Sequence, residues 1–342
     1  MTEGLEETDG AGGGGSALST LGDTVGDLVT GIPAPVRKNA IKAFGRLCTA
    51  AVEYPVSIIE NAIEERRAES RARVKLIDVS ASQIATQMQT DPDYARAAAS
   101  KFAHKIIRER VNVDQISEFA ATDLKSEPHT SANDKEPEAP PISEDWLNAF
   151  ESEAAQMSSE HMQRLFGKIL AGEIRRPASY SIKTIKLMAQ LDNRAADLFR
   201  QLCSLSISWR VPNSNMIIDA RVVSMGMAGA NSLQAYGLNF DALNILQEHG
   251  LIISDYNSYV DIADVVSPAR IAVMHGRDAF MPATYQNAQW AFLPKVAPSE
   301  RQEFRVAGVA FSHSGKELLS IVDITRNEQY TVALKTFSTS KE

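Results

Sequence analysis

Glu173 is the side chain whose position in the sequence best suits acid–base chemistry. It stands in the run Gly172-Glu173-Ile174-Arg175-Arg176-Pro177, in the last turn of a predicted helix. The helix dipole disfavours an anion at that end and favours the two arginines that follow it. A carboxylate placed there is either neutralised by a neighbouring group or held ready for a ligand, as the general acid or base of an enzyme would be.

We favour the structural explanation for Glu173. Ser181 can cap the next helix, and Glu173 can accept hydrogen bonds from backbone N–H groups near 181–184 or pair with Lys183. No second catalytic group is close in sequence, which argues against an active site. The sequence therefore predicts a structural helix joint made of Gly172, Glu173, Arg175, Pro177, Ser181 and Lys183.

Other patterns that could support chemistry are weak. The six histidines are scattered without an H-x3-H spacing, and no cysteine pair joins them, so no metal site is predicted. The glycines of 226–231 follow a predicted strand but lack the G-x-G-x-x-G pattern and a following Lys-Ser/Thr, so a flexible turn is favoured over a phosphate site. No G-x-S-x-G is present. We expect no catalytic residue, cofactor or small-molecule ligand, although an enzyme with a site assembled from distant residues stays open.

The composition limits the class of protein. Hydrophobic residues make up 44% of the 342 residues, and the net charge of −8 argues against a general nucleic-acid binder. The two cysteines, Cys48 and Cys203, lie far apart in apolar surroundings, which favours a reducing compartment over a disulfide. With neither a signal-peptide pattern nor a spanning segment, we expect a cytoplasmic protein, with a peripheral position at the inner membrane as an alternative.

The elements that would position the joint divide the chain into five parts. A linker is predicted where proline and charged residues leave almost nothing to bury. The parts are a disordered Gly-rich tail at 1–16, a helical N-terminal domain at 17–121, a disordered linker at 122–142, a helical bundle at 143–206 and an α+β domain at 207–342. The predicted fold class is therefore mainly α, with a small α+β unit.

The bundle and the C-terminal part differ in their hydrophobic period. Ser143, Ser181 and Asp192 are predicted helix caps within the bundle, and a helix is predicted to restart at 158–160. After residue 206, a strand at 216–223 is followed by a helix at 240–248 and a hairpin at 251–262, an order that resembles a winged helix. Further strands are predicted at 290–292 and 304–311.

Two helices are predicted near the C-terminus. Ser314 is the predicted cap of a helix through 318–321. For Tyr330–Phe337 a helix is favoured, although the spacing of its apolar residues also fits a strand.

Three segments carry a resemblance to known proteins. They are Trp146-x3-Phe150, the run Ser159–Ile174 that contains Leu170-Ala171-Gly172-Glu173-Ile174, and Pro177-x-Ser179-Tyr180-Ser181-x-Lys183-Thr184; the tail 312–319 fits as well. This pattern resembles an uncharacterised bacterial domain family whose members lack an assigned activity, over about 143–337. The layout is also loosely similar to the abortive-infection alpha proteins of phage defence. The first resemblance implies no catalytic residues, and the second implies an antiviral function.

The N-terminal helices are the expected contact region. The stretch 36–63 is amphipathic and begins with Arg37, Lys38, Lys42 and Arg46, so it could lie on a membrane surface; a helix packed on the rest of the domain or on another subunit is favoured. The sequence thus predicts a non-enzymatic interaction protein with a protein partner or a second copy of itself. The alternative is a DNA-binding regulator, which the polar and slightly acidic face of 239–248 disfavours.

Overall fold

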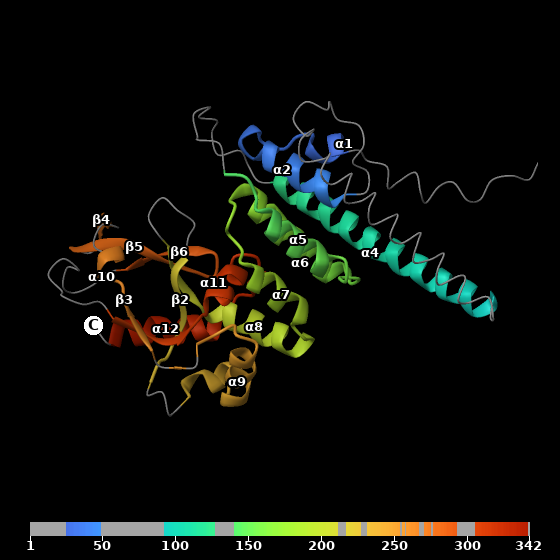
Figure 1. The fold of residues 1–342 in the computed structure, drawn as a ribbon. Helices are drawn as coiled ribbons and strands as arrows, with labels where there is room; N and C mark the ends of the chain where they lie inside the picture. Colours follow the sequence, from blue (N-terminus) through green and yellow to red (C-terminus); the bar gives the residue numbers. More distant parts are fainter. Residues whose placement is uncertain are drawn as a thin grey trace, which may run out of the picture. The chain divides into compact units, whose positions relative to one another are not determined.

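Two compact units, Met1–Pro177 and Ala178–Glu342, make up the chain in the computed structural model (Figure 1). The structure describes residues 25–48, 92–126, 140–210, 217–226, 231–253, 255–256, 258–266, 270–274, 276–292 and 305–340. The predicted tail at 1–16 lies outside these ranges. None of the helices in these ranges is both long and apolar enough to span a membrane.

The described part of the first unit is helical. Its helices are α1 (Val25–Val29), α2 (Ala34–Leu47), α4 (Pro92–Ser126), α5 (Glu144–Ala154) and α6 (Glu160–Arg175). α6 begins at the cap Ser159, whose side chain accepts a hydrogen bond from the backbone N–H of Met162. The predicted cap Ser143 stands at the N-cap position of α5, but its side chain makes no capping hydrogen bond. It packs closely on α4 at Gly167, where an added Cβ would lie 2.7 Å from the Cβ of Phe119.

The core of the first unit joins α2, α5 and α6. The Trp146 and Phe150 rings stack with centroids 5.1 Å apart, and Phe150 contacts Phe166 at 5.7 Å. α2 buries Ala40, Ala43, Phe44 and Leu47. The part of 36–63 that the structure describes is therefore a packed helix, as favoured; residues 49–63 lie outside the described ranges.

The second unit combines helices with an antiparallel sheet. Its helical elements are α7 (Ile182–Gln190), α8 (Asn193–Leu205), the short 3-10 helix η3 (Ser232–Tyr236), α9 (Phe240–Glu248), α10 (Ala263–Val266), α11 (His313–Leu319) and α12 (Glu328–Ser340). Its strands are β1 (Ile207–Arg210), β2 (Ile217–Val223), β3 (Tyr259–Asp261), β4 (Arg270–Met274), β5 (Arg277–Tyr285), β6 (Ala288–Phe292) and β7 (Arg305–Ala310). The strand order is β3-β7-β2-β1-β5-β4, and β6 also pairs with β5.

Helices of the second unit pack against this sheet. Phe199 of α8 meets Phe311, just after β7, with ring centroids 5.9 Å apart. Tyr330 of α12 is fully buried, and its hydroxyl donates to the Val223 carbonyl of β2 at 3.1 Å. The predicted helix at Tyr330–Phe337 is confirmed within α12. The coarse prediction of a mainly α chain with an α+β C-terminal part therefore agrees with the described elements.

The predicted hairpin at 251–262 is wrong. Ile252 forms an antiparallel bridge with Phe311, and β3 pairs with β7 through Tyr259 and Ala307. The segments at 252 and 259–261 therefore both pair with β7. This strand is longer than either segment, so it can form more backbone hydrogen bonds than the two segments could form with each other. The described part of 251–262 has no hairpin of its own, and the sequence pattern also missed β1, β4 and β5.

Three boundaries differ from the sequence prediction. α4 continues to Ser126, so the first residues of the predicted linker are helical, because Leu124 is buried in the first unit. The predicted bundle 143–206 is divided, since α5 and α6 belong to the first unit and α7 and α8 to the second. The helix that was expected to begin at Ser314 is capped by Ser312, whose hydroxyl accepts from the backbone N–H of Gly315.

Candidate functional site

The start of α7 is one half of the best-defined polar site of the second unit. Ser181 is its N-cap and accepts a hydrogen bond from the backbone N–H of Thr184 at 3.3 Å. The two hydroxyl oxygens of Ser181 and Thr184 also lie 3.0 Å apart. This local pattern confirms the predicted cap and leaves the backbone N–H of Ser181 itself in need of an acceptor.

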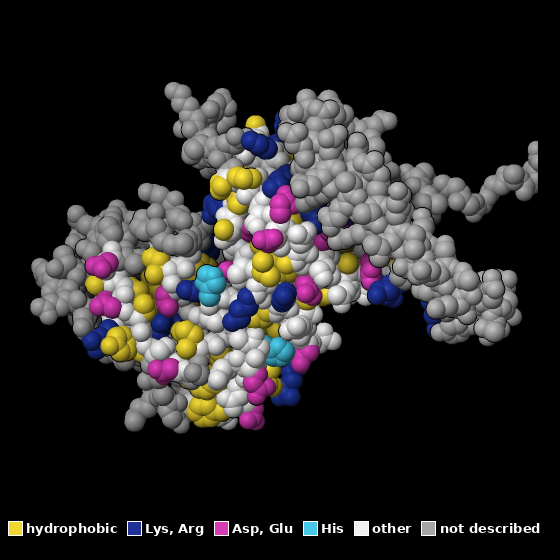
Figure 2. Space-filling view, in the orientation of Figure 1, with side chains coloured by type: hydrophobic (Ala, Val, Ile, Leu, Met, Phe, Trp, Pro, Cys, Tyr) yellow, Lys and Arg dark blue, Asp and Glu magenta, His cyan; other side chains and the backbone are white. Residues whose placement is uncertain are grey.

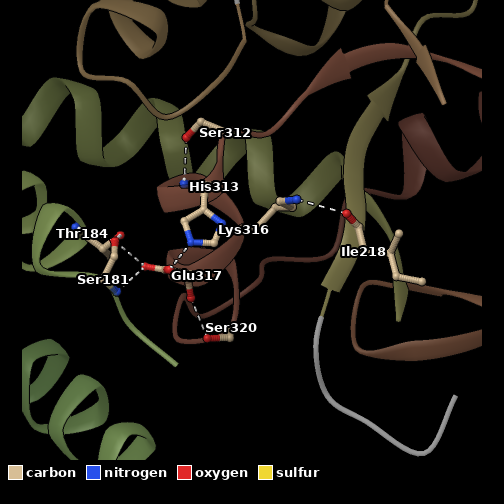
Figure 3. A network of polar contacts seen from close by, with 9 residues as sticks. Ser181, Thr184, Ile218, Ser312, His313, Lys316, Glu317 and Ser320 are labelled. Carbon is tan, nitrogen blue, oxygen red and sulfur yellow. Dashed lines mark hydrogen bonds and ion pairs between the residues drawn. The ribbon is translucent and has the colours of Figure 1, made fainter. Parts of the chain in front are cut away.

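Glu317 of α11 supplies that acceptor (Figure 3). Its Oε2 accepts from the Ser181 backbone N–H at 2.9 Å and from the Ser181 hydroxyl at 3.1 Å. Its Oε1 lies 2.8 Å from Nε2 of His313, one turn earlier in α11. The Glu317 side chain is 10% exposed and that of His313 is 78% exposed, so the carboxylate is held inside and the imidazole faces solvent.

α11 is fixed on the sheet side by three further contacts. The Ser312 hydroxyl donates to the Gly250 carbonyl at 2.5 Å. Nζ of Lys316 donates to the Ile218 carbonyl of β2 at 3.0 Å (Figure 3). A Cβ added at Gly315 would lie 2.1 Å from the Leu251 carbonyl oxygen, so only glycine permits this approach.

A second link joins α7 and α11 beside Glu317. The hydroxyls of Tyr180 and Ser320 lie 3.0 Å apart, and the Ser320 hydroxyl donates to the Glu317 carbonyl at 2.7 Å. The segments 177–184 and 312–319, which carry the family resemblance at opposite ends of the unit's sequence, therefore lie against each other. We call Ser181, Glu317 and His313 the α7–α11 clasp.

The α7–α11 clasp has the residue types of a hydrolase triad but a different arrangement. In a triad the imidazole contacts the serine hydroxyl and the carboxylate orients the imidazole. Here the carboxylate of Glu317 contacts both, and the Ser181 hydroxyl serves the helix cap. The hydroxyl therefore donates to a carboxylate that also accepts from backbone, an arrangement that stabilises a helix start.

The predicted joint residues fall into both units. Glu173 is buried at 1% exposure in α6, and Arg175 pairs with Asp123 of α4 at 2.8 Å. Gly172 accepts the capping hydrogen bond from the Arg176 backbone N–H, and the first unit ends at Pro177. Lys183 is exposed in the second unit.

The carboxylate that accepts from the Ser181 backbone N–H is Glu317. The predicted contacts of Glu173, with backbone N–H groups near 181–184 or with Lys183, stay predictions. Sequence reasoning missed Glu317 because it lies 136 residues from Ser181, although it stands inside the tail segment that carried the resemblance.

Other candidate groups in the described ranges offer little chemistry. Burial raises the pKa of the Cys48 thiol to about 12 and that of Cys203 well above its usual value, so neither thiol is a nucleophile at neutral pH. Among the described residues, no group of histidine, cysteine and acidic side chains could hold a metal ion. Of the predicted turn 226–231, residues 227–230 lie outside the described ranges.

Comparison with protein families identifies the family of this chain. The family described as "Protein of unknown function (DUF2806)" matches residues 96–335. The chain belongs to this family. The DUF2806 match begins inside α4, earlier than the resemblance from 143 onward indicated, and it ends within α12. No curated protein and no solved structure matches the chain.

Proposed function

We propose that this DUF2806 protein is a non-enzymatic interaction protein that binds a protein partner through α4. The observation that carries the proposal is a basic face on this helix. Lys101, Lys105 and Arg108 are exposed and spaced by four and three residues, so they share one side of α4, where Lys105 also lies 3.7 Å from Glu109. We call these three residues the α4 basic face.

The length of α4 leaves this face beyond its main helical neighbour. α4 has 35 residues and spans about 52 Å, whereas α6 has 16 residues and spans about 24 Å. Among the residues of α4 whose side chains are described, the buried ones begin at Asn112. The extended helix in Figure 1 thus carries its positive charges outside the core of the first unit.

A protein partner fits this helix better than a membrane does. An interfacial helix needs one continuous apolar side. Among the residues of α4 whose side chains are described, the exposed large apolar ones are Ile106 and Val111, 42% and 39% exposed, and they point about 140° apart around the helix. The basic residues of α2 do not favour a membrane either, since Lys42 pairs with Glu144 at 3.0 Å and Arg46 with Glu151 at 3.1 Å.

The DNA-regulator alternative has weaker support. The helix expected to read DNA, α9, contains no lysine or arginine and carries Asp241 and Glu248. The wing that the winged-helix interpretation requires is the hairpin that does not form in 251–262. An acidic recognition helix would be repelled by phosphates.

Phage defence is the proposed setting, on the loose similarity to abortive-infection alpha proteins. Cells carrying the full chain with its genomic neighbours would be challenged with phage, and survival compared with that of cells carrying K101E/K105E/R108E. A matched control, K186E/R194E/R326E, changes the same charge at exposed residues of the second unit. We expect the control to protect and the α4 variant to lose protection.

The other outcomes of the phage challenge would each contradict part of the proposal. Equal protection by the α4 variant would contradict the role of the α4 basic face, and no protection by the wild type would remove the defence setting. Tight binding of the wild type to phosphatidylglycerol vesicles, or to duplex DNA at low salt, with loss in the α4 variant, would replace the protein partner by a membrane or by DNA.

A further inference from the structure

The surface around α9 presents aromatic and aliphatic side chains to solvent. Phe240 is 45% exposed and Ile253 is 47% exposed. The rings of Phe240 and Tyr256 stack with centroids 6.5 Å apart. The Tyr256 hydroxyl is 2.7 Å from Oδ1 of Asn244 and 2.9 Å from Oε1 of Gln247, so the ring is held in place on the helix. An exposed group of this kind is typical of a contact surface.

Acidic side chains accompany these rings. Asp241 and Glu248 lie on the exposed side of α9, and Asp255 is exposed in the following segment. Burial and the negative charge of Glu248 both raise the pKa of Tyr256. Figure 2 shows hydrophobic and acidic side chains next to each other where Figure 1 labels α9. We call Phe240, Asp241, Glu248, Ile253, Asp255 and Tyr256 the α9 patch.

Charge decides what can bind the α9 patch. Three carboxylates repel nucleic acid and anionic lipid, and they favour a basic surface. The α4 basic face has three cations within two helical turns, so its charge is opposite to that of the α9 patch. The chain therefore carries both halves of a complementary pair, one in each unit.

We propose that the partner of the α4 basic face is a second copy of this chain, bound at its α9 patch. The inference rests on the proposed function, because it identifies the occupant of that helix. If two copies met through their α9 patches, or through their α4 basic faces, like charges would lie together. A two-fold symmetric contact through either surface alone is therefore disfavoured. The contact joins different surfaces and is head-to-tail, which produces a ring or a growing chain of copies.

The test uses the full chain in sedimentation velocity across a wide concentration range. The wild type is expected to rise in mass with concentration and to dissociate at high salt. K101E/K105E/R108E and D241K/E248K/D255K are each expected to weaken self-association by about tenfold or more. The control K186E/R194E/R326E is expected to associate like the wild type, and circular dichroism confirms that each variant is folded.

Mixing provides the decisive measurement. Each variant keeps one intact surface, so an equimolar mixture of the two is expected to form a heterodimer that neither forms alone. A wild type that stays monomeric at every concentration, or a mixture that stays monomeric, would overturn the inference. If the wild type is monomeric while K101E/K105E/R108E still loses phage protection, the proposed function survives with a foreign acidic partner.

Discussion

Glu317 Oε2 lies 2.9 Å from the backbone nitrogen of Ser181, which precedes it by 136 residues. A carboxylate from one helix thus completes the N-terminus of another, where the positive end of the helix dipole favours negative charge. The contact joins the two segments of the second unit that carry the family resemblance. It explains why these segments have a recognisable pattern without requiring that they perform a reaction.

Removing the Glu317 carboxylate should destabilise the second unit. Glu317→Ala leaves the Ser181 N–H without this acceptor, and hydrogen bonds to a charged group contribute about 2 kcal/mol. We expect Glu317→Gln to lose less stability than Glu317→Ala, because the amide oxygen of glutamine can still accept a hydrogen bond from the Ser181 N–H. Urea unfolding followed by fluorescence measures the change.

His313 provides the control for the clasp. Its side chain is 78% exposed, and an exposed ion pair contributes between about 0 and 1 kcal/mol. His313→Ala should therefore change the free energy of unfolding by less than Glu317→Ala. A larger loss for His313→Ala would mean that the imidazole, rather than the carboxylate, holds α7 and α11 together.

The close packing of α4 and α6 gives a second prediction. Gly167→Ala would place a Cβ 2.7 Å from the Phe119 Cβ and 3.1 Å from the Ala120 nitrogen, so the helices must move apart. Overpacking of this kind costs about 1–3 kcal/mol. We expect a lower midpoint of thermal unfolding for this variant.

Gly45→Ala is the matched substitution in α2. Nothing lies within 4 Å of a Cβ added at Gly45, so the change should stabilise the helix by about 0.5–1 kcal/mol. The two glycine variants should thus shift the thermal midpoint in opposite directions. A shift of the same sign in both would show that helix propensity, and not the α4–α6 contact, determines the result.

Local chemistry made some of these features predictable from the sequence. The caps Ser181 and Asp192 were predicted because a cap bonds to an N–H only three residues away. Ser143 was predicted on the same ground, but its side chain makes no such bond. The close approach at Gly167 was not predicted, since the neighbouring Phe119 belongs to another helix. Glu317 was missed for the same reason, because no local pattern identifies a partner 136 residues away.

The strands of the sheet were also only partly predictable from local sequence. β2 and β7 have enough apolar residues in sequence to be predicted, whereas β1 has only four residues. A segment that short takes its structure from the strand it pairs with. The hairpin at 251–262 was predicted from a plausible turn, but β7 supplied the pairing that fixed both segments.

Alkaline pH should destabilise the protein through buried thiols. Burial raises the pKa of Cys48 from 9.0 to about 12, so the folded state holds the thiol proton more tightly than the unfolded state does. The resulting stabilisation is fully present below pH 9 and is lost as pH rises toward 12. Thermal midpoints measured between pH 8 and pH 11 should therefore fall. Cys48→Ala should reduce the dependence of the thermal midpoint on pH. An unchanged dependence would assign the effect to other groups, such as Tyr330, whose pKa burial also raises.

Arg221 gives the strongest prediction for the sheet. Its side chain is 3% exposed and contacts Asp219 through Nε at 2.7 Å and through a terminal nitrogen at 3.2 Å. It also donates to the carbonyls of Ser258 at 2.6 Å and Val306 at 3.1 Å, and so ties β2 to β7 and to the residue that precedes β3.

Arg221→Met leaves the Asp219 carboxylate and two carbonyls without these donors. Breaking a buried pair by removing one partner costs about 3–5 kcal/mol. Adding Asp219→Asn removes the unbalanced charge, so the double variant should be more stable than Arg221→Met alone. Urea unfolding of both variants tests this order. If the double variant is the less stable of the two, the cost arises from the lost carbonyl contacts, and Arg221 acts as a strand tie rather than as half of an ion pair.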